Sequence, residues 1–555
     1  MPDDSTTGVR TGGLLDLIER TGNRLPDPAT LFLLGTILII VVSAIAATTN
    51  LTVQPRLPVP VTETVIGDDG TDVIRTVLDE SGSPHLEWQA QGEPLQAKNL
   101  LTRDGIFWLL SNLVKNFTSF PPLGVVLVGM LGIGIAERTG LLGALLKGFM
   151  LIVPGKLLTP AMVFIGIMSS MALDAGYVVL PPLAALLYIS VGRSPLAGIA
   201  AVFAGVSAGF NANLFITGLD PMLAGFATTG GQVIDPSYQM NPACNWYFMI
   251  GSTFVITLTG WAVTSLFVER RLRMKPPEEG GPPVSTTGTD LEAQRLTPTE
   301  LRGMGWAMTS LAVVLGIFLA MMLIPGGPLY GLGNLFDRWV EAIVPIIFFC
   351  FVVPGIVYGV VTKSVRSDKD AAKLLIESMA AMAPIIVLAF FAAQFIESFK
   401  YSGLDRMLAM AGGQALGQAA LPAWMLIVAF ILLTVVFNLF VGSMSAKYAM
   451  FAPIFIPMFM LVSISPELTQ AAYRIGDSVS NAITPLNAYL VIVLVFMQKY
   501  VPKGGMGTLI STMLPYTIVF TIVWTIMLLL WMWLGIPLGP DGPLTWDVAG
   551  AVIAE

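Results

Sequence analysis

The segment AYRIGDSVSNAITP, from Ala472 to Pro485, places an arginine, an aspartate, two serines and an asparagine inside a stretch that hydropathy alone would assign to a membrane span. Such groups are costly in hydrocarbon, and they are retained there where they face a substrate or an ion pathway. The segment therefore predicts a polar site within a membrane.

The composition is that of an integral membrane protein built of helices. Mean hydropathy is +0.76. Of the 555 residues, 55% are hydrophobic and 12% charged, against roughly 25% charged residues in soluble domains. Long unbroken apolar runs exclude a membrane β-barrel, and the expected fold class is an all-α polytopic membrane protein. The net charge of −7 is spread over loops and predicts no nucleic-acid partner. Cys244 and Cys350 lie in apolar surroundings and indicate core positions.

Lysines and arginines set the expected orientation. Arg10, Arg20 and Arg24 precede the first span, so the N-terminus is predicted to be cytoplasmic in the inner (cytoplasmic) membrane. An acidic stretch, 50–100, follows as an external loop. The same reasoning predicts nine crossings, near 30–47, 121–136, 195–220, 245–268, 303–324, 341–362, 374–398, 467–498 and 508–535.

A basic run, ERRLRMK, opens a segment rich in proline, glycine, serine and threonine that cannot build a core. This segment separates two halves of the chain. The expected organisation is a cytoplasmic N-terminus at 1–28, a first half at 29–268, a cytoplasmic linker at 269–302, a second half at 303–538 and an external tail at 539–555.

Two further apolar segments, 158–189 and 422–462, carry polar, glycine-bearing breaks near their middles. Two full crossings by each would fit the charge pattern equally well, but the breaks favour re-entrant helical hairpins that enter from opposite sides. An interrupted helix follows each hairpin, at 195–221 and 467–498. This order predicts an inverted-topology repeat, as in secondary transporters, where substrate and ions bind at the broken helices.

Five segments carry a resemblance to a known family. They are AYRIGDSVSNAITP, FNLFVGSMSAKYAMFAPIFIPM (437–458), NLVKNFTSFPPLG (112–124), AGYVVLPPLAAL (175–186) and ERTGNRLPDPATLF (19–32). Together they resemble the p-aminobenzoyl-glutamate transporter family, AbgT, from about residue 19 to residue 538. The resemblance implies a homodimer of subunits with nine helices and two hairpins, similar to the ion-transporter superfamily, and an aromatic amide dicarboxylate as substrate.

Asp477 is predicted to couple transport to an ion. Ser478, Ser480 and Asn481 flank it and complete the oxygen-rich shell that a hard cation such as Na⁺ prefers. A buried carboxylate can equally carry a proton. A third interpretation is a fixed salt bridge between Asp477 and Arg474, which lies three residues earlier on the same helix face.

Arg474 suits an anionic substrate because its planar guanidinium binds a carboxylate through two hydrogen bonds, and in the family the matching arginine is associated with the site. We expect Asn438, Ser443 and Ser445 to line the substrate site at the tip of the second hairpin. Pro485 is a further candidate contact, although helix geometry explains it equally well.

The first half offers a matching set of polar residues. Ser169 and Ser170 are predicted to contact the substrate, whereas Asp174, Asn211 and Asn213 are predicted to bind the ion. The expected Na⁺ ligands are Asn211, Asn213, Asp477 and Asn481, and no other cofactor is expected.

Asp220 precedes a proline near the outer end of the interrupted helix, where capping is the expected role. Gly205, Gly209 and Gly218 either permit unwinding or allow close packing between helices.

One position departs from the family pattern, in which SAQW includes the hairpin serine. Here the tetrad is SAKY, with Lys447 and Tyr448. Tyr448 keeps an aromatic ring for stacking on a benzoyl group. Lys447 adds a charge expected to hold a second carboxylate or to repel a cation.

The sequence lacks the residues of two common types of hydrolase active site. The single histidine, His85, lies in the predicted external loop, which excludes a buried Ser-His-Asp arrangement and an H-E-x-x-H zinc motif. Three hypotheses remain. One is an ion-coupled carrier of p-aminobenzoyl-glutamate or a related aromatic carboxylate; the second is an exporter of sulfonamide-like antimetabolites, which the family also implies. The third, a passive channel, fits less well because the polar groups gather at two midplane breaks.

Overall fold

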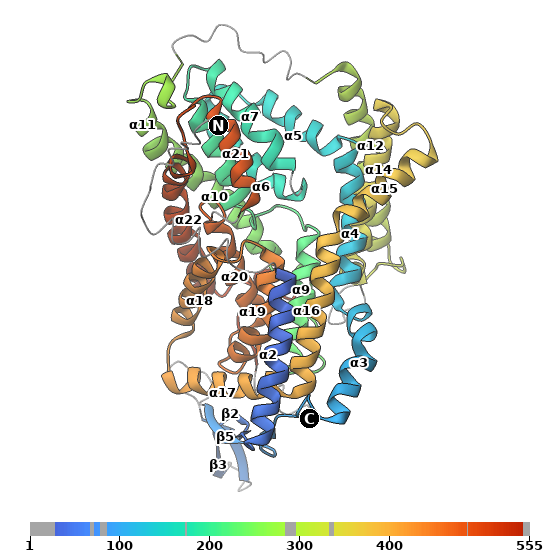
Figure 1. Ribbon diagram of the computed structural model, residues 1–555, viewed down its shortest axis with the longest axis vertical. Coiled ribbons are helices and arrows are strands. Elements are labelled where there is room, and N and C mark those ends of the chain that lie inside the picture. The colour runs from blue at the N-terminus through green and yellow to red at the C-terminus, as the bar shows by residue number, and fades with distance from the viewer. Residues whose placement is uncertain are drawn as a thin grey trace, which may run out of the picture.

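The computed structural model describes residues 28–66, 72–77, 86–172, 175–283, 296–331, 338–484 and 487–547. Most of these residues are helical, and the helices run mainly along the long axis of the molecule (Figure 1). Pro485 and Asp174, both named above as site residues, lie outside the described residues.

Six helical stretches of the described residues are long and apolar enough to cross a membrane. They are α2 (Pro28–Thr48), α12 (Pro298–Leu323), α14 (Ile343–Thr362), α16 (Ala383–Ser402), α22 (Met506–Leu534) and the run formed by α10 (Trp246–Val263), η4 (Thr264–Val268) and α11 (Glu269–Leu272). A seventh is the bent pair of α4 (Pro121–Arg138) and α5 (Leu141–Ile152), if the two count as one span. The prediction of a multi-pass helical membrane protein is therefore confirmed, while the number of nine crossings stays a prediction.

Both segments predicted as hairpins are divided near their middles, the second at residues 439–443, slightly before the predicted break at 442–447. The first consists of α6 (Leu158–Met168), η2 (Ser169–Ala172) and α7 (Ala175–Ser190), and the second of α18 (Ala423–Asn438) and α19 (Met444–Met460). The four α-helices hold between 11 and 17 residues, which is fewer than the roughly 20 needed to span a bilayer.

The two interrupted helices open at different points. In the first, α8 (Pro195–Phe203) and η3 (Ala204–Ala208) end before α9 (Leu219–Gly231) begins. In the second, α20 (Pro466–Ser480) is separated from α21 (Ala488–Gln498). The polar segment was expected to form the interruption itself, but it stays helical as far as Ser480. Its side chains hydrogen-bond to neighbouring elements, so the α20 backbone does not need to open.

The segment predicted as an external loop contains antiparallel strand pairs, which corrects the all-α expectation. The pairs are β1 (Thr52–Val53) with β6 (Leu95–Gln96), β2 (Arg56–Pro60) with β5 (Leu86–Ala90), and β3 (Thr62–Ile66) with β4 (Asp72–Thr76). Runs such as TETVI alternate polar and β-branched residues, a pattern typical of strands. Hydropathy and charge predict only that this loop is external, and they do not predict whether its strands pair.

Several helices were not predicted. They are α3 (Arg103–Thr118), α5, α13 (Arg338–Glu341), α15 (Asp368–Ala381) and α17 (Leu404–Ala419), with short 3₁₀ turns at Gly155–Leu157 and Pro277–Glu279. The crossing expected at 374–398 is divided at Met382 into α15 and α16. A capping box between Ser367 and Asp370 starts α15, and a proline in the first turn of α16 favours a new helix start.

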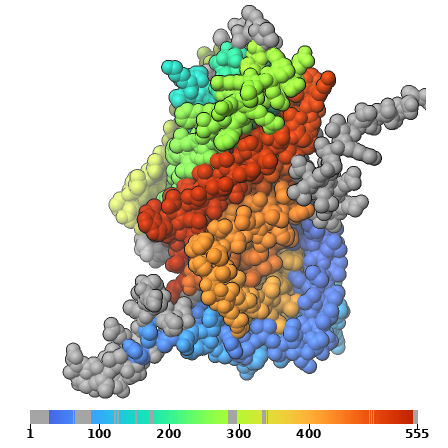
Figure 2. Space-filling view, turned by 90° about the vertical axis from the view of Figure 1, so that its left-hand side faces the viewer, coloured from blue at the N-terminus to red at the C-terminus, as the bar shows by residue number. Residues whose placement is uncertain are grey.

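The centre of the fold is α20, all 15 residues of which are buried. It packs against α18, α19 and α22, while α9 packs against α19. Outside this group, α4, α12 and α14 pack together and α2 lies along α16 (Figure 1). Figure 2 shows α22, in red, crossing one face obliquely as part of the outer wall. The polar residues of α20 are thus enclosed on every side by protein.

Gly205 illustrates the second interpretation offered for the glycines. A Cβ atom on Gly205 would collide with the backbone of α6 at Val163 and Gly166, and one on Gly166 would collide with Val202 and Gly205. The two glycines therefore allow α6 and η3 to approach closely, as small residues do between membrane helices.

Asp405 is a buried carboxylate in α17, which is not among the helices apolar enough to span. It is 3% exposed, and its Oδ1 has no hydrogen-bond partner among the described residues. Burial raises the pKa of Asp405 from its ordinary value of 3.8 to about 6, although nearby Arg406 and Lys400 oppose the effect.

Replacing Asp405 by asparagine is expected to stabilise the protein above pH 6 and not below pH 4. Because the pKa is higher in the folded state, its contribution to stability is complete below the ordinary value of 3.8 and is lost as the pH rises through about 6. The difference corresponds to at most about 3 kcal/mol. Melting temperatures of Asp405→Asn and wild type across this range test it; equal values at about pH 7.5 would contradict the expected burial effect.

Candidate functional site

Two buried ion pairs join α20 to its neighbouring helices. In the first, Arg474 Nη2 lies 2.6 Å from Asp220 Oδ1, and the side chains are 4% and 1% exposed. The other oxygen of Asp220 accepts from the backbone N–H and the hydroxyl of Thr217, at 2.6 and 2.9 Å. Asp220 thus bonds the chain entering α9 but does not cap the helix, whose N-cap is Gly218 without a side-chain cap hydrogen bond. It also neutralises an arginine, a role that sequence reasoning missed.

Arg474 is held further by Gln470, whose Oε1 accepts from Nη2 and Nε at 3.2 and 3.4 Å. Asn245 Nδ2 donates to the same oxygen at 2.7 Å. Of the two Asp220 oxygens, only Oδ1 bonds the guanidinium. The guanidinium is therefore oriented on α20 by neutral groups and neutralised by one oxygen of one carboxylate.

The second ion pair joins Lys447 to Asp477. Lys447 Nζ lies 2.8 Å from Asp477 Oδ1, and both side chains are 0% exposed. The ammonium also donates to Asn438 Oδ1 and, at 3.3 Å, to the carbonyl of Val441. The suggested salt bridge between Arg474 and Asp477 is therefore wrong. The two residues lie on one helix, but each is neutralised by a partner from a different element.

Asn211 links the first half of the chain to this centre. Its Nδ2 donates to Ser478 Oγ at 2.7 Å and to Asp477 Oδ2 and the Arg474 carbonyl, both at 3.2 Å. Its backbone N–H also donates to Ser478 Oγ, at 3.1 Å. The interruption after α8 and the middle of α20 are therefore joined through one asparagine.

Asn438, the last residue of α18, hydrogen-bonds to two further predicted residues, Ser480 and Asn481. Its Nδ2 donates to the Asp477 carbonyl at 2.8 Å, to Ser480 Oγ at 2.9 Å and to Asn481 Oδ1 at 2.8 Å. Thr484 Oγ1 donates back to the Asn438 carbonyl at 3.0 Å. The end of the second hairpin's first helix is thereby fixed against the end of α20.

The predicted first-half residues form a separate cluster. Asn213 Nδ2 donates to Ser170 Oγ at 2.7 Å. Ser169 and Ser170 donate to carbonyls of their own helix, Gly166 at 2.6 Å and Ile167 at 2.8 Å. Asn213 thus pairs with the first hairpin, whereas Asn211 pairs with α20.

The second hairpin tip presents a different surface. Ser443 caps α19 by accepting from the N–H of Ala446 at 3.3 Å, and its hydroxyl lies 3.3 Å from that of Ser445. Tyr448 is fully buried. Its ring centroid lies 4.4 Å from that of Tyr473 and 6.4 Å from that of Phe226.

Glu467 is a further buried carboxylate of α20 that sequence reasoning did not name. It accepts from the Tyr238 hydroxyl at 2.7 Å. The closeness of Glu467 to the charged segment 472–485 could have marked it as a site residue. Lys447 was named in the sequence because it follows the hairpin residue Ser445 by two positions. Neither spacing indicates a partner, because these contacts join residues far apart in the chain.

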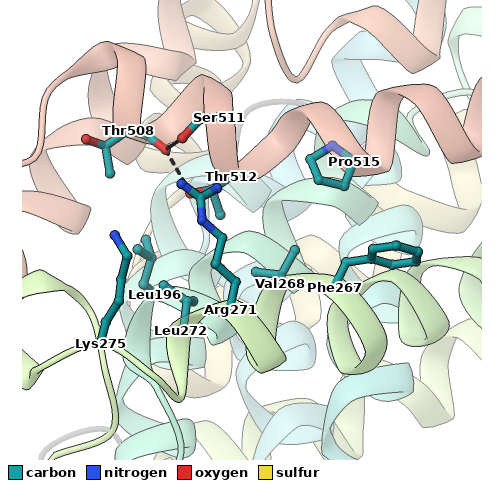
Figure 3. Close-up of a pocket in the computed structure, with 10 residues that line it drawn as sticks. All are labelled: Leu196, Phe267, Val268, Arg271, Leu272, Lys275, Thr508, Ser511, Thr512 and Pro515. Atoms are coloured by element: carbon teal, nitrogen blue, oxygen red, sulfur yellow. Dashed lines mark hydrogen bonds between the residues drawn. The ribbon is translucent and has the colours of Figure 1, made fainter.

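Three cavities show where space exists. Beside Ser445 is a recess of about 20 Å³ lined by Phe120, Phe226 and neighbouring apolar residues. A larger apolar groove, about 590 Å³, runs from Met168 and Met171 at the first hairpin tip to α12 and α14. A third cavity, about 200 Å³, lies between α11 and the start of α22 (Figure 3). None of the residues lining the three belongs to either buried ion pair.

The Arg474–Asp220 pair should show strong energetic coupling. Arg474→Gln or Asp220→Asn alone is expected to cost about 3–5 kcal/mol, because each leaves one uncompensated buried charge. The double variant should lose at least about 1 kcal/mol less than the sum of the two. Chemical unfolding in detergent measures all three.

The surface pair Arg138–Glu377, at 3.2 Å and 32% and 41% exposed, is the matched control. Arg138→Gln should cost about 0–1 kcal/mol. Strictly additive losses for Arg474→Gln and Asp220→Asn would show that these two charges do not interact.

Comparisons with known proteins extend over nearly the whole chain. A sequence model described as the AbgT putative transporter family matches residues 13–546. The p-aminobenzoyl-glutamate transport protein of Escherichia coli (strain K12) is 34% identical over 536 residues, which cover 96% of this chain and 97% of that protein.

Two solved structures are also similar. The crystal structure of the Alcanivorax borkumensis YdaH transporter, described as revealing an unusual topology, has a TM-score of 0.78 and 37% identity, covering 93% of this chain and 100% of that one. Neisseria gonorrhoeae MtrF, described as illuminating a class of antimetabolite efflux pumps, has a TM-score of 0.83 and 39% identity, covering 96% and 100%.

Proposed function

The chain belongs to the AbgT transporter family, and on that premise we propose that it is a secondary active transporter. It moves p-aminobenzoyl-glutamate or a related aromatic carboxylate across the inner membrane by alternating access, coupled to H⁺ or Na⁺. The observation that carries this proposal is the meeting of both interrupted helices at α20, where Arg474 and Asp477 are each paired and buried within the protein. Carriers bind substrate and ions where such broken helices meet.

The proposed topology has nine crossings and two opposed re-entrant hairpins, with a cytoplasmic N-terminus. It is supported by the order of elements, since a short-helix hairpin precedes an interrupted helix in each half. The halves 29–268 and 303–538 then form an inverted repeat around the ion pairs. A homodimer is part of the same proposal, on the strength of the family resemblance.

Arg474 is the proposed anchor for a substrate carboxylate. A carboxylate arriving from the substrate would replace Asp220, keep the guanidinium neutralised, and allow a bidentate contact in place of the present single oxygen. Tyr473 lies beside Arg474 on α20, and the rings of Tyr448 on α19 and Phe226 on α9 lie near it. They supply the stacking surface that a benzoyl group needs.

Substrate entry requires movement at the second hairpin. The recess beside Ser445 holds about 20 Å³, whereas sites for small molecules hold roughly 300–1,000 Å³. Tyr448 is fully enclosed. We assign the motion to the non-helical residues 439–443, because they connect two short helices and carry Ser443 at their end.

Export of antimetabolites is the alternative function. It is favoured by the 39% identity to MtrF, which is described among antimetabolite efflux pumps. Sulfonamides share the p-aminophenyl group of p-aminobenzoyl-glutamate and would use the same aromatic surface. They lack the glutamate carboxylates, so they depend less on Arg474.

Reconstituted liposomes test both functions. With Na⁺ and pH gradients imposed separately, labelled p-aminobenzoyl-glutamate and a labelled sulfonamide are followed in both directions. Accumulation against a concentration difference should require one of the gradients, and Asp477→Asn should abolish it. Accumulation with neither gradient would contradict ion coupling.

Asp368→Asn is the matched control, since it removes an exposed carboxylate in the first turn of α15. It should accumulate substrate as wild type does. If Asp477→Asn also does so, Asp477 has no coupling role.

A further inference from the structure

The ammonium of Lys447 occupies a cage of oxygen atoms. A carboxylate oxygen of Asp477 lies 2.8 Å from Nζ, the backbone carbonyl of Val441 lies at 3.3 Å, and Asn438 Oδ1 is a third acceptor. Lys447, Asp477 and Asn438 are all 0% exposed. One carboxylate, one amide oxygen and one backbone carbonyl form the kind of set that binds a hard cation.

The location of the cage strengthens this interpretation. Asn438 is the last residue of α18, and Val441 lies in the break before α19. The last carbonyls of a helix lack intrahelical partners and carry the negative end of its dipole. In carriers with broken helices, such ends coordinate the transported cation. Lys447, one turn into α19, places its own charge at this point.

The Na⁺ site expected from the sequence does not fit the contacts of its four residues. Asn211 turns its amide N–H groups, not its oxygen, toward Asp477. Asn213 bonds to Ser170, and the oxygen of Asn481 accepts from Asn438.

We propose that Lys447 is a tethered cation, whose ammonium takes the place of a free metal ion at the second hairpin. The charges of Lys447 and Asp477 cancel, so a Na⁺ ion added to the cage would leave an uncompensated buried positive charge. The wild-type cage therefore excludes Na⁺. Removing the lysine charge leaves Asp477 unpaired among oxygen ligands, and the cage becomes a Na⁺ site.

This assignment corrects one expectation about the substrate. Lys447 is engaged with Asp477 and enclosed by protein, so it is not available to hold a second carboxylate in this conformation. Any role of the tethered cation in coupling transport to an ion rests on the proposed function. The cage itself does not rest on that function, because it is present in the protein without substrate.

The test measures Na⁺ binding by purified protein in detergent without any substrate. The melting temperature is followed while NaCl replaces choline chloride at constant ionic strength, and ²²Na⁺ binding is measured directly. Wild type and Lys447→Arg, which keeps the charge, should not respond. Lys447→Gln should show a saturable rise in melting temperature of a few degrees and saturable ²²Na⁺ binding. Lys447→Gln with Asp477→Asn should lose both responses.

Two outcomes would overturn the proposal. One is saturable Na⁺ binding by wild type that Asp477→Asn abolishes, a result that stands even if Lys447→Gln fails to fold. The other is a folded, monodisperse Lys447→Gln that ignores Na⁺. A failure to transport aromatic carboxylates would leave these measurements unchanged, so the two proposals fail separately.

A second, independent observation concerns the cavity of about 200 Å³ between α11 and α22. Figure 3 shows Arg271 and Lys275 rising from the α11 side, with Phe267 and Pro515 along the wall. The hydroxyls of Ser511 and Thr512 donate to the Thr508 carbonyl at 3.0 and 2.7 Å (Figure 3). Arg271 and Lys275 are the cations that line the cavity, and Lys275 also pairs with Glu279, whose Oε2 lies 3.9 Å from Nζ.

We infer that this cavity binds the phosphate headgroup of an anionic phospholipid. Two basic side chains four residues apart suit a phosphate, and the apolar wall suits the glycerol and acyl portion. The cavity lies at the basic end of the apolar run Trp246–Leu272. Basic pockets between membrane helices on the cytoplasmic side bind such headgroups.

Native mass spectrometry with phosphatidylglycerol and phosphatidylethanolamine tests the inference. Arg271→Gln should reduce phosphatidylglycerol adducts several-fold, while the matched control Arg270→Gln, on the same short helix but outside the cavity lining, should not. If both variants lose phosphatidylglycerol adducts equally, the binding reflects general charge attraction and not this cavity. Phosphatidylglycerol adducts that Arg271→Gln leaves unchanged would overturn the lipid inference.

Discussion

The fold depends on neutralising Arg474 and Asp477, two of the ionisable side chains of a helix from which solvent is excluded. Every residue of α20 is buried, yet the helix carries Arg474 and Asp477. Asp220 from α9 neutralises the first and Lys447 from α19 neutralises the second. Because removing one partner of a buried pair costs about 3–5 kcal/mol, α9, α19 and α20 are stable only when assembled together.

The interruptions in the helices follow from the same requirement. A continuous helix keeps its backbone groups to itself, whereas a broken one offers N–H and carbonyl groups to ions and polar side chains. Asp220 bonds the chain leading into α9, and the Val441 carbonyl faces the Lys447 ammonium. The breaks therefore supply backbone groups that hydrogen-bond to the partners of the α20 charges, in addition to changing the direction of the chain.

A site whose charges are already paired can bind a ligand only by exchanging partners. The Arg474–Asp220 pair permits such an exchange, since a substrate carboxylate carries the same charge as the one it replaces. The Lys447–Asp477 pair differs, because the partner that another helix supplies to α20 is an ammonium, and an anionic substrate cannot take its place. Arg474 and Asp477 lie three residues apart on one helix, and only the partner of Arg474 has the charge of the substrate carboxylate.

Much of the polar centre could be predicted from the sequence. Hydropathy identified the spans, and charged groups in apolar runs pointed to Arg474, Asp477, Asn211 and Asn438, all of which hydrogen-bond within one centre. The pairing was not predictable, because residues 254 positions apart, such as Asp220 and Arg474, share no sequence pattern. Asn213 also differed from expectation, since a spacing of two residues placed it with the first hairpin instead of with Asn211.

The sequence by itself determined that this chain is a multi-pass helical membrane protein with polar breaks in two of its apolar segments, because hydropathy and glycine-bearing polar segments are local properties. It also determined which side chains are too costly to bury alone. Only the tertiary structure decided their partners and hence their chemistry. Neutralisation acts across a few ångströms of space, and the side chains that meet there lie up to 254 positions apart in the sequence.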